Sequence, residues 1–258
     1  MTLFSFRLVP VATLALILVA NVGAVDSAQA EPAIVAKARA FVGAEAALNA
    51  VKSVHFVGSL TTGDSADPTK SARATIEIFF QAPDRQRIQA TSEKTIEVTA
   101  LDGYEAWSRV QDAADSKKWR LSLLGANEIR RLRANTWESL AFYRGIESHG
   151  GHIEDLGTVQ TEGLTCAKLA FIYDHNIVFY RYLDAATGRL VYTENEAGST
   201  QREQGTLVVN GIRFPQSIIT TTNKADGHVQ TVILTFDKVI VNEAMPASLF
   251  AVPSPTAK

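Results

Sequence analysis

Two histidines three positions apart form the most suggestive cluster of reactive side chains in the chain. His149 and His152 flank Gly150-Gly151, and Glu154 and Asp155 follow closely. Imidazole nitrogens and carboxylate oxygens are common zinc ligands, so this segment could hold a metal ion. A glycine-rich turn leading into a strand accounts for the same residues without a ligand, and we therefore predict no metal site.

The remaining reactive side chains form no recognisable catalytic pattern. His55, His175 and His228 are scattered, and Cys166 lies within an apolar stretch. A thiol in such a stretch is more often an inert part of the core than a nucleophile. The sequence contains no motif of zinc proteases, serine hydrolases, phosphate-binding loops or dinucleotide-binding folds. We therefore predict no catalytic residues and no cofactor.

The composition is that of an ordinary globular protein and argues against a nucleic-acid partner. The chain has 258 residues, a formal net charge of -2 and a pI of about 6.2. Proteins that bind duplex DNA are usually strongly basic. The one cysteine cannot form an internal disulfide, so the fold must be stabilised by its core.

The first thirty residues have the pattern of an export signal. Arg7 precedes an apolar run from Leu8 to Ala20, and Ala28-Gln29-Ala30 forms a small-residue cleavage site before Glu31. A retained membrane anchor is the alternative, but the apolar run is shorter than the roughly 20 residues that span a bilayer. We predict a signal peptide over residues 1–30, a single domain over 31–258, and a periplasmic location.

Two stretches predict amphipathic helices. Over residues 34–51, Ile34, Phe41 and Leu48 recur every seven positions, so one face of that helix must be buried. Over residues 123–144, apolar side chains follow three- and four-residue spacings.

Three arginines crowd the first half of the second predicted helix: Arg130, Arg131 and Arg133. A solvated helix face is one interpretation. A basic docking patch for an acidic partner or lipid headgroups is the other, and the sequence leaves both open.

Most of the rest of the chain alternates between extended runs and short turns. Residues 75–81 turn at Pro83-Asp84 into a second run over 85–92, and two further runs meet at Asp102-Gly103, which suits a tight hairpin. Residues 112–118 are polar and predict a loop or hairpin tip. Later runs include 158–160, 164–173, 177–184 and 212–222. This spacing predicts an α+β fold with one curled antiparallel sheet of roughly ten or eleven strands, forming an unclosed half barrel covered by two helices.

Several strands carry more apolar bulk than simple alternation requires. Residues 177–183 are bulky on both faces, and Phe79 and Trp107 lie opposite Ile78 and Ala106 on their own strands. A sheet covered on both sides would explain this. The other explanation is an apolar cavity between the sheet and a helical lid, in which each buried methylene of an acyl chain contributes about 0.8 kcal/mol.

Short sequence markers along the chain resemble those of the LolA/LolB-type periplasmic lipoprotein carriers. They are Ala47-Leu48-Asn49-Ala50-Val51-Lys52-Ser53-Val54 at the end of the first helix, Phe80-Gln81-Ala82-Pro83-Asp84-Arg85-Gln86-Arg87, Leu101-Asp102-Gly103-Tyr104-Glu105-Ala106-Trp107 and Leu249-Phe250-Ala251-Val252-Pro253. The resemblance implies an open barrel covered by helices that carries or binds a lipid or acylated ligand without catalysis. It also implies a lipid or lipid-modified protein as partner, an envelope membrane protein as donor or acceptor, and a monomer.

One position departs from this pattern. The lipoprotein carriers have an arginine, tied to lid opening, directly before the proline that ends this strand, whereas this chain has Ala82. Arg85 and Arg87 follow the proline instead, so the opening mechanism does not transfer. The cargo need not be a lipoprotein.

The expected site has a cavity and a lid. The predicted cavity residues are Ile76, Ile78, Phe80, Ile96, Val98, Trp107, Phe171, Phe179 and Phe236. The predicted lid residues are Phe41, Leu48, Leu132 and Leu140. A register slip of one residue exchanges the two faces of a strand, so this set of cavity residues depends on the strand register. Two other functions stay open: a lipid-sensing or protein-interaction module of the cell envelope and, less favoured, an envelope hydrolase.

Overall fold

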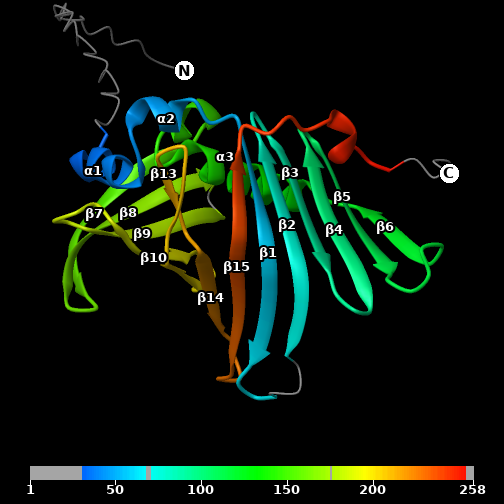
Figure 1. The fold of residues 1–258 in the computed structure, drawn as a ribbon. Coiled ribbons are helices and arrows are strands. Elements are labelled where there is room, and N and C mark those ends of the chain that lie inside the picture. The colour runs from blue at the N-terminus through cyan, green and yellow to red at the C-terminus, as the bar shows by residue number, and fades with distance from the viewer. Residues whose placement is uncertain (1–30, 68–70, 175, 254–258) are drawn as a thin grey trace, which may run out of the picture. The chain divides into compact units, whose positions relative to one another are not determined.

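A single curled antiparallel sheet of thirteen strands forms most of the computed structural model, which describes residues 31–67, 71–174 and 176–253 (Figure 1). The spatial order is β6-β5-β4-β3-β2-β1-β15-β14-β11-β10-β9-β8-β7. The strands at the two ends of this order, β6 and β7, are not paired with each other, so the sheet stays open. This confirms the predicted α+β half barrel.

The strand bounds extend the sequence prediction. The sheet contains β1 (Ser53–Asp64), β2 (Ala72–Gln81), β3 (Arg85–Thr91), β4 (Thr95–Asp102), β5 (Glu105–Asp112), β6 (Trp119–Leu123), β7 (His152–Thr161), β8 (Leu164–Asp174), β9 (Ile177–Asp184), β10 (Leu190–Asn195), β11 (Thr200–Gln204), β14 (Ser217–Asn223) and β15 (Val229–Val241). A separate two-stranded ribbon contains β12 (Leu207–Val209) and β13 (Ile212–Phe214).

Three parts of the strand prediction were wrong. β6 and β11 were not expected: the alternation of β6 spans only five residues between the predicted loop and the predicted helix, and β11 contains no apolar side chain. β7 begins at His152 rather than at Thr158. The predicted run over 212–222 is two strands, β13 and β14, which Pro215 separates, since proline has no N–H to donate to a ladder.

The first predicted helix is two short helices, α1 (Ala33–Val42) and α2 (Glu45–Asn49). The backbone is extended at Gly43 and Ala44, so the helix cannot continue through them. Gly43 also lies tightly against the backbone of Gly211, where an added Cβ would approach the carbonyl oxygen to 3.0 Å. The predicted continuous helix over 34–51 is therefore corrected to a helix-break-helix unit.

The second predicted helix is α3 (Ala126–Ala141), shorter than the expected 123–144. Leu123 ends β6, and the helix stops where Phe142 and Tyr143 take positive φ angles of 47° and 72°. Single-turn 3-10 helices follow at Ile146–His149 and Ala247–Leu249.

The first and last long strands lie side by side in the middle of the sheet. β1 pairs with β15 from Val54 opposite Val241 to Asp64 opposite Gln230, with a bulge at Val57/Gly58. Gly58 permits this close approach, because a Cβ there would lie 2.0 Å from the carbonyl oxygen of Thr235.

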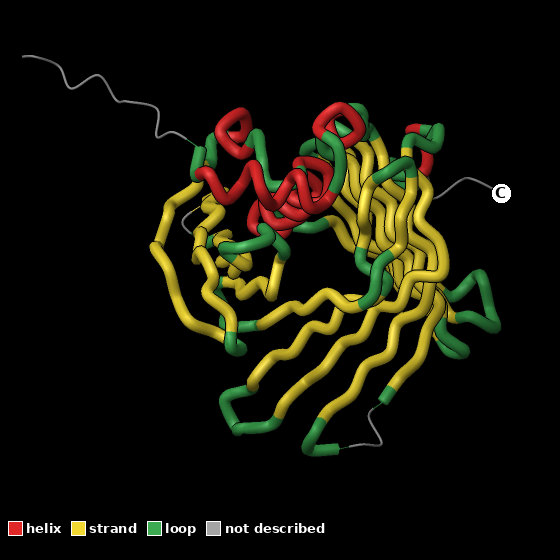
Figure 2. The backbone as a smooth tube through the Cα atoms, turned by 60° about the vertical axis from the view of Figure 1, so that its left-hand side comes forward, coloured by secondary structure: helices red, strands yellow, loops and turns green. Residues whose placement is uncertain are grey.

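The three α-helices cover one face of the sheet, and the strands curl around the region beneath them (Figure 2). Leu140 of α3 packs against the buried cluster Ile76, Ile78, Phe80 and Phe236. We call the side of the sheet that carries this cluster the inner face and the opposite side the outer face. Cross-strand partners share a face, so the register assigns the paired residues of the sheet to one side or the other.

None of the helices in the described ranges is both long and apolar enough to cross a bilayer. The predicted signal peptide falls on residues 1–30, outside the described residues.

Candidate ligand-binding site

The inner face carries an apolar surface that the helices leave partly uncovered. Its fully buried centre is Ile76, Ile78, Phe80 and Phe236. Around that centre lie side chains that remain partly exposed: Phe56, Leu60, Ile88, Leu140, Leu207, Ile218 and Leu234. We call these seven residues the apolar rim. Because the rim is continuous with the core, a bound apolar group could extend the core without rearranging it.

The rim crosses the central strands in register. Leu60 of β1 faces Leu234 of β15, which in turn faces Ile218 of β14. The next residues on the last two strands, Ile233 and Ile219, face each other on the outer side. Ile218 and Ile219 of β14 are therefore the same type of side chain on opposite faces of one strand.

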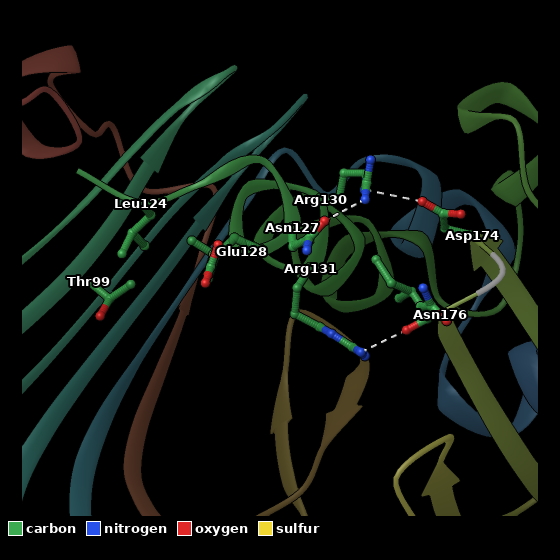
Figure 3. Close-up of a pocket in the computed structure, with 10 residues that line it drawn as sticks. Thr99, Leu124, Asn127, Glu128, Arg130, Arg131, Asp174 and Asn176 are labelled. Carbon is green, nitrogen blue, oxygen red and sulfur yellow. Dashed lines mark hydrogen bonds and ion pairs between the residues drawn. The ribbon is translucent and has the colours of Figure 1, made fainter. Parts of the chain in front are cut away.

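A hollow of about 460 Å³ lies beside the first half of α3 (Figure 3). Its lining comes from three regions: Thr99 of β4, the helix with the segment before it, and the β8–β9 turn. The residues are Thr99, Leu124, Asn127, Glu128, Arg130, Arg131, Leu132, Asp174, Asn176 and Ile177. Its volume lies within the 300–1,000 Å³ typical of small-molecule pockets, and its lining mixes apolar and charged side chains.

Ion pairs join α3 to both halves of the curled sheet. Arg133 approaches Asp84 of the β2–β3 turn at 3.1 Å, and Arg130 approaches Asp174 at the end of β8 at 3.2 Å. Arg131 pairs with Glu196. The three arginines are therefore not a free basic patch, because each forms an ion pair, whereas Arg130, at 52% exposure, still belongs to a solvated helix face.

A buried polar group joins the middle of α3 to β9. Glu138 of the helix pairs with Arg181 and accepts a hydrogen bond of 2.6 Å from the hydroxyl of Tyr173. The Arg181 guanidinium lies 4.5 Å from the ring centres of both Tyr143 and Phe171. Burial lowers the pKa of Arg181 to about 10, so it stays charged at neutral pH.

Glu203 of β11 lies on the inner wall near this group. Its side chain contacts solvent, yet the surrounding protein desolvates the carboxylate and raises its pKa, an effect that the charge of Arg181 partly offsets. The inner face thus carries charged side chains, among them Arg181 and Glu203, as well as the apolar rim.

The C-terminal end of α3 is held differently. The buried side chain of Arg39 in α1 donates hydrogen bonds of 2.9 and 2.7 Å to the carbonyl oxygens of Ala141 and Phe142. A cation at this end satisfies carbonyls that have no partner within the helix. Glu45 of α2 in turn accepts two hydrogen bonds from Arg39.

The register divides the nine predicted cavity residues between both faces. Ile76, Ile78, Phe80 and Phe236 lie together on the inner face. Phe171 and Phe179 face each other on the inner side of β8 and β9, where Phe171 packs with Val35 and Ala38 of α1. Ile96, Val98 and Trp107 are on the outer face, because Val98 pairs with Gln89 whereas Thr99 pairs with the inner Ile88. The nine residues therefore do not line one space.

The predicted lid residues also divide. Leu140 belongs to the apolar rim and Leu132 lines the hollow. Leu48 is a core residue packed against Ile212 and Phe214. Phe41 is 37% exposed, with its ring centre 5.4 Å from the guanidinium of Arg213.

Sequence reasoning missed Leu60, Ile218, Leu234, Glu138 and Arg181. The first three lie in recognisable strands, but their inner position depends on the pairing of β1, β15 and β14. The buried ion pair joins residues 43 positions apart, for which the sequence holds no local signal.

The histidine and cysteine side chains have separate surroundings. The ring of His149 stacks on Trp137 at 3.9 Å, and burial lowers the pKa of His149. His152 lies 3.2 Å from Glu154. Among the residues that the structure describes, no group of three or more histidine, cysteine or acidic side chains is placed to hold a metal ion. Cys166 is fully buried, and desolvation raises the pKa of its thiol.

Comparison with known proteins identifies the fold. No family model and no curated protein matches the sequence. Among solved structures, a LolA superfamily protein from Nitrosomonas europaea superposes with a TM-score of 0.56 at 12% identity, over 85% of this chain and 96% of the other. A DUF1329 family protein from Desulfovibrio piger gives 0.54 at 7% identity, over 85% and 96% of the two chains. A putative outer membrane lipoprotein-sorting protein domain from Vibrio parahaemolyticus gives 0.52 at 10% identity, over 84% and 94%. The chain therefore has a LolA-like fold.

Proposed function

We propose that the chain is a non-enzymatic carrier or binder of a lipid or acylated ligand in the cell envelope. The ligand's acyl chain lies against the apolar rim of the inner face, beneath α3, and reaches solvent beside the hollow at the helix's first half. The partly exposed rim, continuous with the buried cluster, is the observation that carries this proposal.

The energetics favour an extended apolar ligand. Burial of a methylene contributes about 0.8 kcal/mol, so a chain of many carbons binds usefully without a dedicated polar contact. The rim offers leucine, isoleucine and phenylalanine side chains across β1, β14 and β15. Some of this gain offsets the entropy lost when the ligand is ordered.

The similarity to solved structures supports the same class of function. Two of the structures with this fold are described as a LolA superfamily protein and a putative outer membrane lipoprotein-sorting protein domain. The export signal expected at residues 1–30 would deliver the chain to the periplasm, which agrees with lipid traffic in the envelope.

The experiment is native mass spectrometry of the exported protein, purified without detergent, followed by organic extraction and lipid analysis. We expect a bound lipid or acylated species on the wild-type chain and its loss in Ile218→Glu, since a carboxylate on the rim repels an acyl chain. Ile219→Glu is the matched control, because this neighbour has similar exposure on the same strand but faces outward.

Circular dichroism and thermal unfolding must show that both variants fold. A wild-type protein that carries no lipid and takes up no fluorescent fatty acid would refute the proposal. Equal binding by the two folded variants would show that the rim is not the site.

A further inference from the structure

The outer face of β3, β5 and β6 carries two neighbouring arginines that no acidic side chain neutralises directly. Arg87 and Arg109 have no ion pair in the described ranges, and the Nε atom of Arg109 is buried without a hydrogen-bond partner. Arg87 donates hydrogen bonds to the carbonyl oxygen of Leu249, at 3.2 Å, and to the side chain of Gln89, at 2.8 Å. Desolvation lowers the pKa of Arg87, and the charge of Arg109 lowers it further, although Glu77 acts in the opposite direction.

These arginines open onto a hollow of about 290 Å³ against the C-terminal segment. Trp107 forms its floor, and Ser248, Ala251, Val252 and Pro253 complete the wall. The indole of Trp107 is fixed by a hydrogen bond of 2.9 Å to the carbonyl oxygen of Phe250. A hollow lined by two cationic side chains suits an anionic group such as a phosphate.

Exposed apolar side chains surround the hollow. On β6, Trp119 is 45% exposed and Leu123 is 71% exposed, and both share the outer face with Arg109. Val252, on the wall of the hollow, is 37% exposed. Tryptophan and aliphatic side chains beside basic residues are the usual composition of surfaces that rest on a bilayer.

A membrane fits this surface better than a peptide does. β6 is an edge strand, but it has only five residues, among them the charged Arg120, and short charged edges resist the addition of another strand. The apolar side chains protrude from the face of the sheet rather than along its open backbone edge.

We propose that this outer-face patch, made of Arg87, Arg109, Trp119, Leu123 and Val252, docks the protein on an anionic phospholipid surface. A headgroup phosphate enters the hollow between the two arginines, while Trp119 and Leu123 rest among the headgroups. The patch lies on the opposite face from the apolar rim, so docking is independent of cargo binding.

The test is cosedimentation of the full expressed protein, with its N-terminus determined by intact mass, with vesicles of phosphatidylglycerol and phosphatidylethanolamine. Phosphatidylcholine vesicles provide the neutral comparison. We expect binding to the anionic vesicles that weakens with salt and falls about fivefold for each of Arg87→Gln and Arg109→Gln. The combined Trp119→Ser and Leu123→Ser variant should also bind the anionic vesicles more weakly than wild type. Brominated lipids should quench the tryptophan fluorescence less once Trp119 is removed.

The matched control is Arg73→Gln with Lys238→Gln, which removes two exposed positive charges from the same face but away from the hollow. Its binding should stay close to wild type. The control is compared with the combined Arg87→Gln and Arg109→Gln variant. Equal losses in these two double variants, or no binding of the wild-type protein to anionic vesicles, would overturn the proposal.

Two further measurements distinguish membrane docking from the binding of a free anion or of an acidic peptide. Inorganic phosphate at millimolar concentration should not displace the vesicles, and displacement would mean a site for a free anion instead. Binding of an acidic peptide that excludes the vesicles would likewise overturn membrane docking. Ile218→Glu should dock normally even if it holds no lipid, so failure of docking and failure of the proposed function are distinguishable.

Discussion

The two helical covers of the inner face are attached by different forces. Val35 and Ala38 of α1 are buried against Leu169 and Phe171. Leu48 of α2 is buried in a second cluster, against Ile212 and Phe214. In α3 only the small residues Ala134 and Thr136 are fully buried. Leu140 packs against the core, and several ion pairs join the rest of the helix to the sheet. The α1–α2 unit is thus part of the buried core, whereas α3 is a cover that ion pairs help to hold on the sheet.

This difference gives α3 two unequal ends. Its C-terminal end is fixed to the core through the buried Arg39, which holds the last carbonyl groups. Its first half borders the 460 Å³ hollow and is held by partly exposed pairs. Exposed pairs are weak, so opening for a ligand should begin at the first half of α3.

The largest expected effect is on the core unit. Leu48→Ala should lower the free energy of unfolding by about 2–5 kcal/mol, because it leaves a cavity between α2 and the β12–β13 ribbon. Denaturant titration measures this loss. Phe41→Ala, on the neighbouring helix but partly exposed, should cost much less, and comparable losses would contradict the division between core and cover.

Glu138→Gln tests the buried attachment of α3. The variant leaves the Arg181 charge without its carboxylate, which should cost about 1–3 kcal/mol locally. Hydrogen exchange should show weaker protection of α3 amides with little change in α1. Glu128→Gln, at an exposed position in the first turn of α3, is the control, and uniform loss of protection across both helices would refute a separate cover.

Substitution of Glu203 tests whether the inner wall opposite α3 desolvates this carboxylate. Its pKa is raised above the ordinary 4.5, so its contribution to stability is present at low pH and is lost as pH rises through the raised pKa. Glu203→Gln should therefore be more stable than wild type at pH 7, and this gain should disappear below pH 4.5. Denaturant titrations at both pH values measure it, with Glu93→Gln in the exposed β3–β4 turn as control; a gain that does not depend on pH would contradict the assignment.

The smallest effect is expected at the exposed end of α3. Arg130→Gln should weaken the protection of the first half of the helix by about 0.2–1 kcal/mol, since the pair with Asp174 is partly solvated. High salt should abolish the difference from wild type because screening removes the same interaction. A salt-independent loss would mean that packing, not charge, holds this half.

The sequence predicted the fold class more securely than the site. Alternation and turns gave the open antiparallel sheet, and apolar spacing located α3 close to its bounds. Alternation also paired Ile76, Ile78 and Phe80 correctly on one side of β2. It failed for Ile96, Val98 and Trp107, because each strand's own pattern does not reveal which side its neighbours present to the helices.

What the sequence determined by itself is therefore local: where strands and turns alternate, and which side chains share one side of a strand. The tertiary structure alone decided that β1 and β15 meet, which makes Leu60, Leu234 and Ile218 one inner surface while Ile219 and Ile233 face outward. It also brought Glu138 to Arg181 and left Arg87 and Arg109 together under the C-terminal segment. The physical reason is that a strand's period of two is fixed by covalent geometry, whereas the choice of inner face depends on burial against partners far away in the chain.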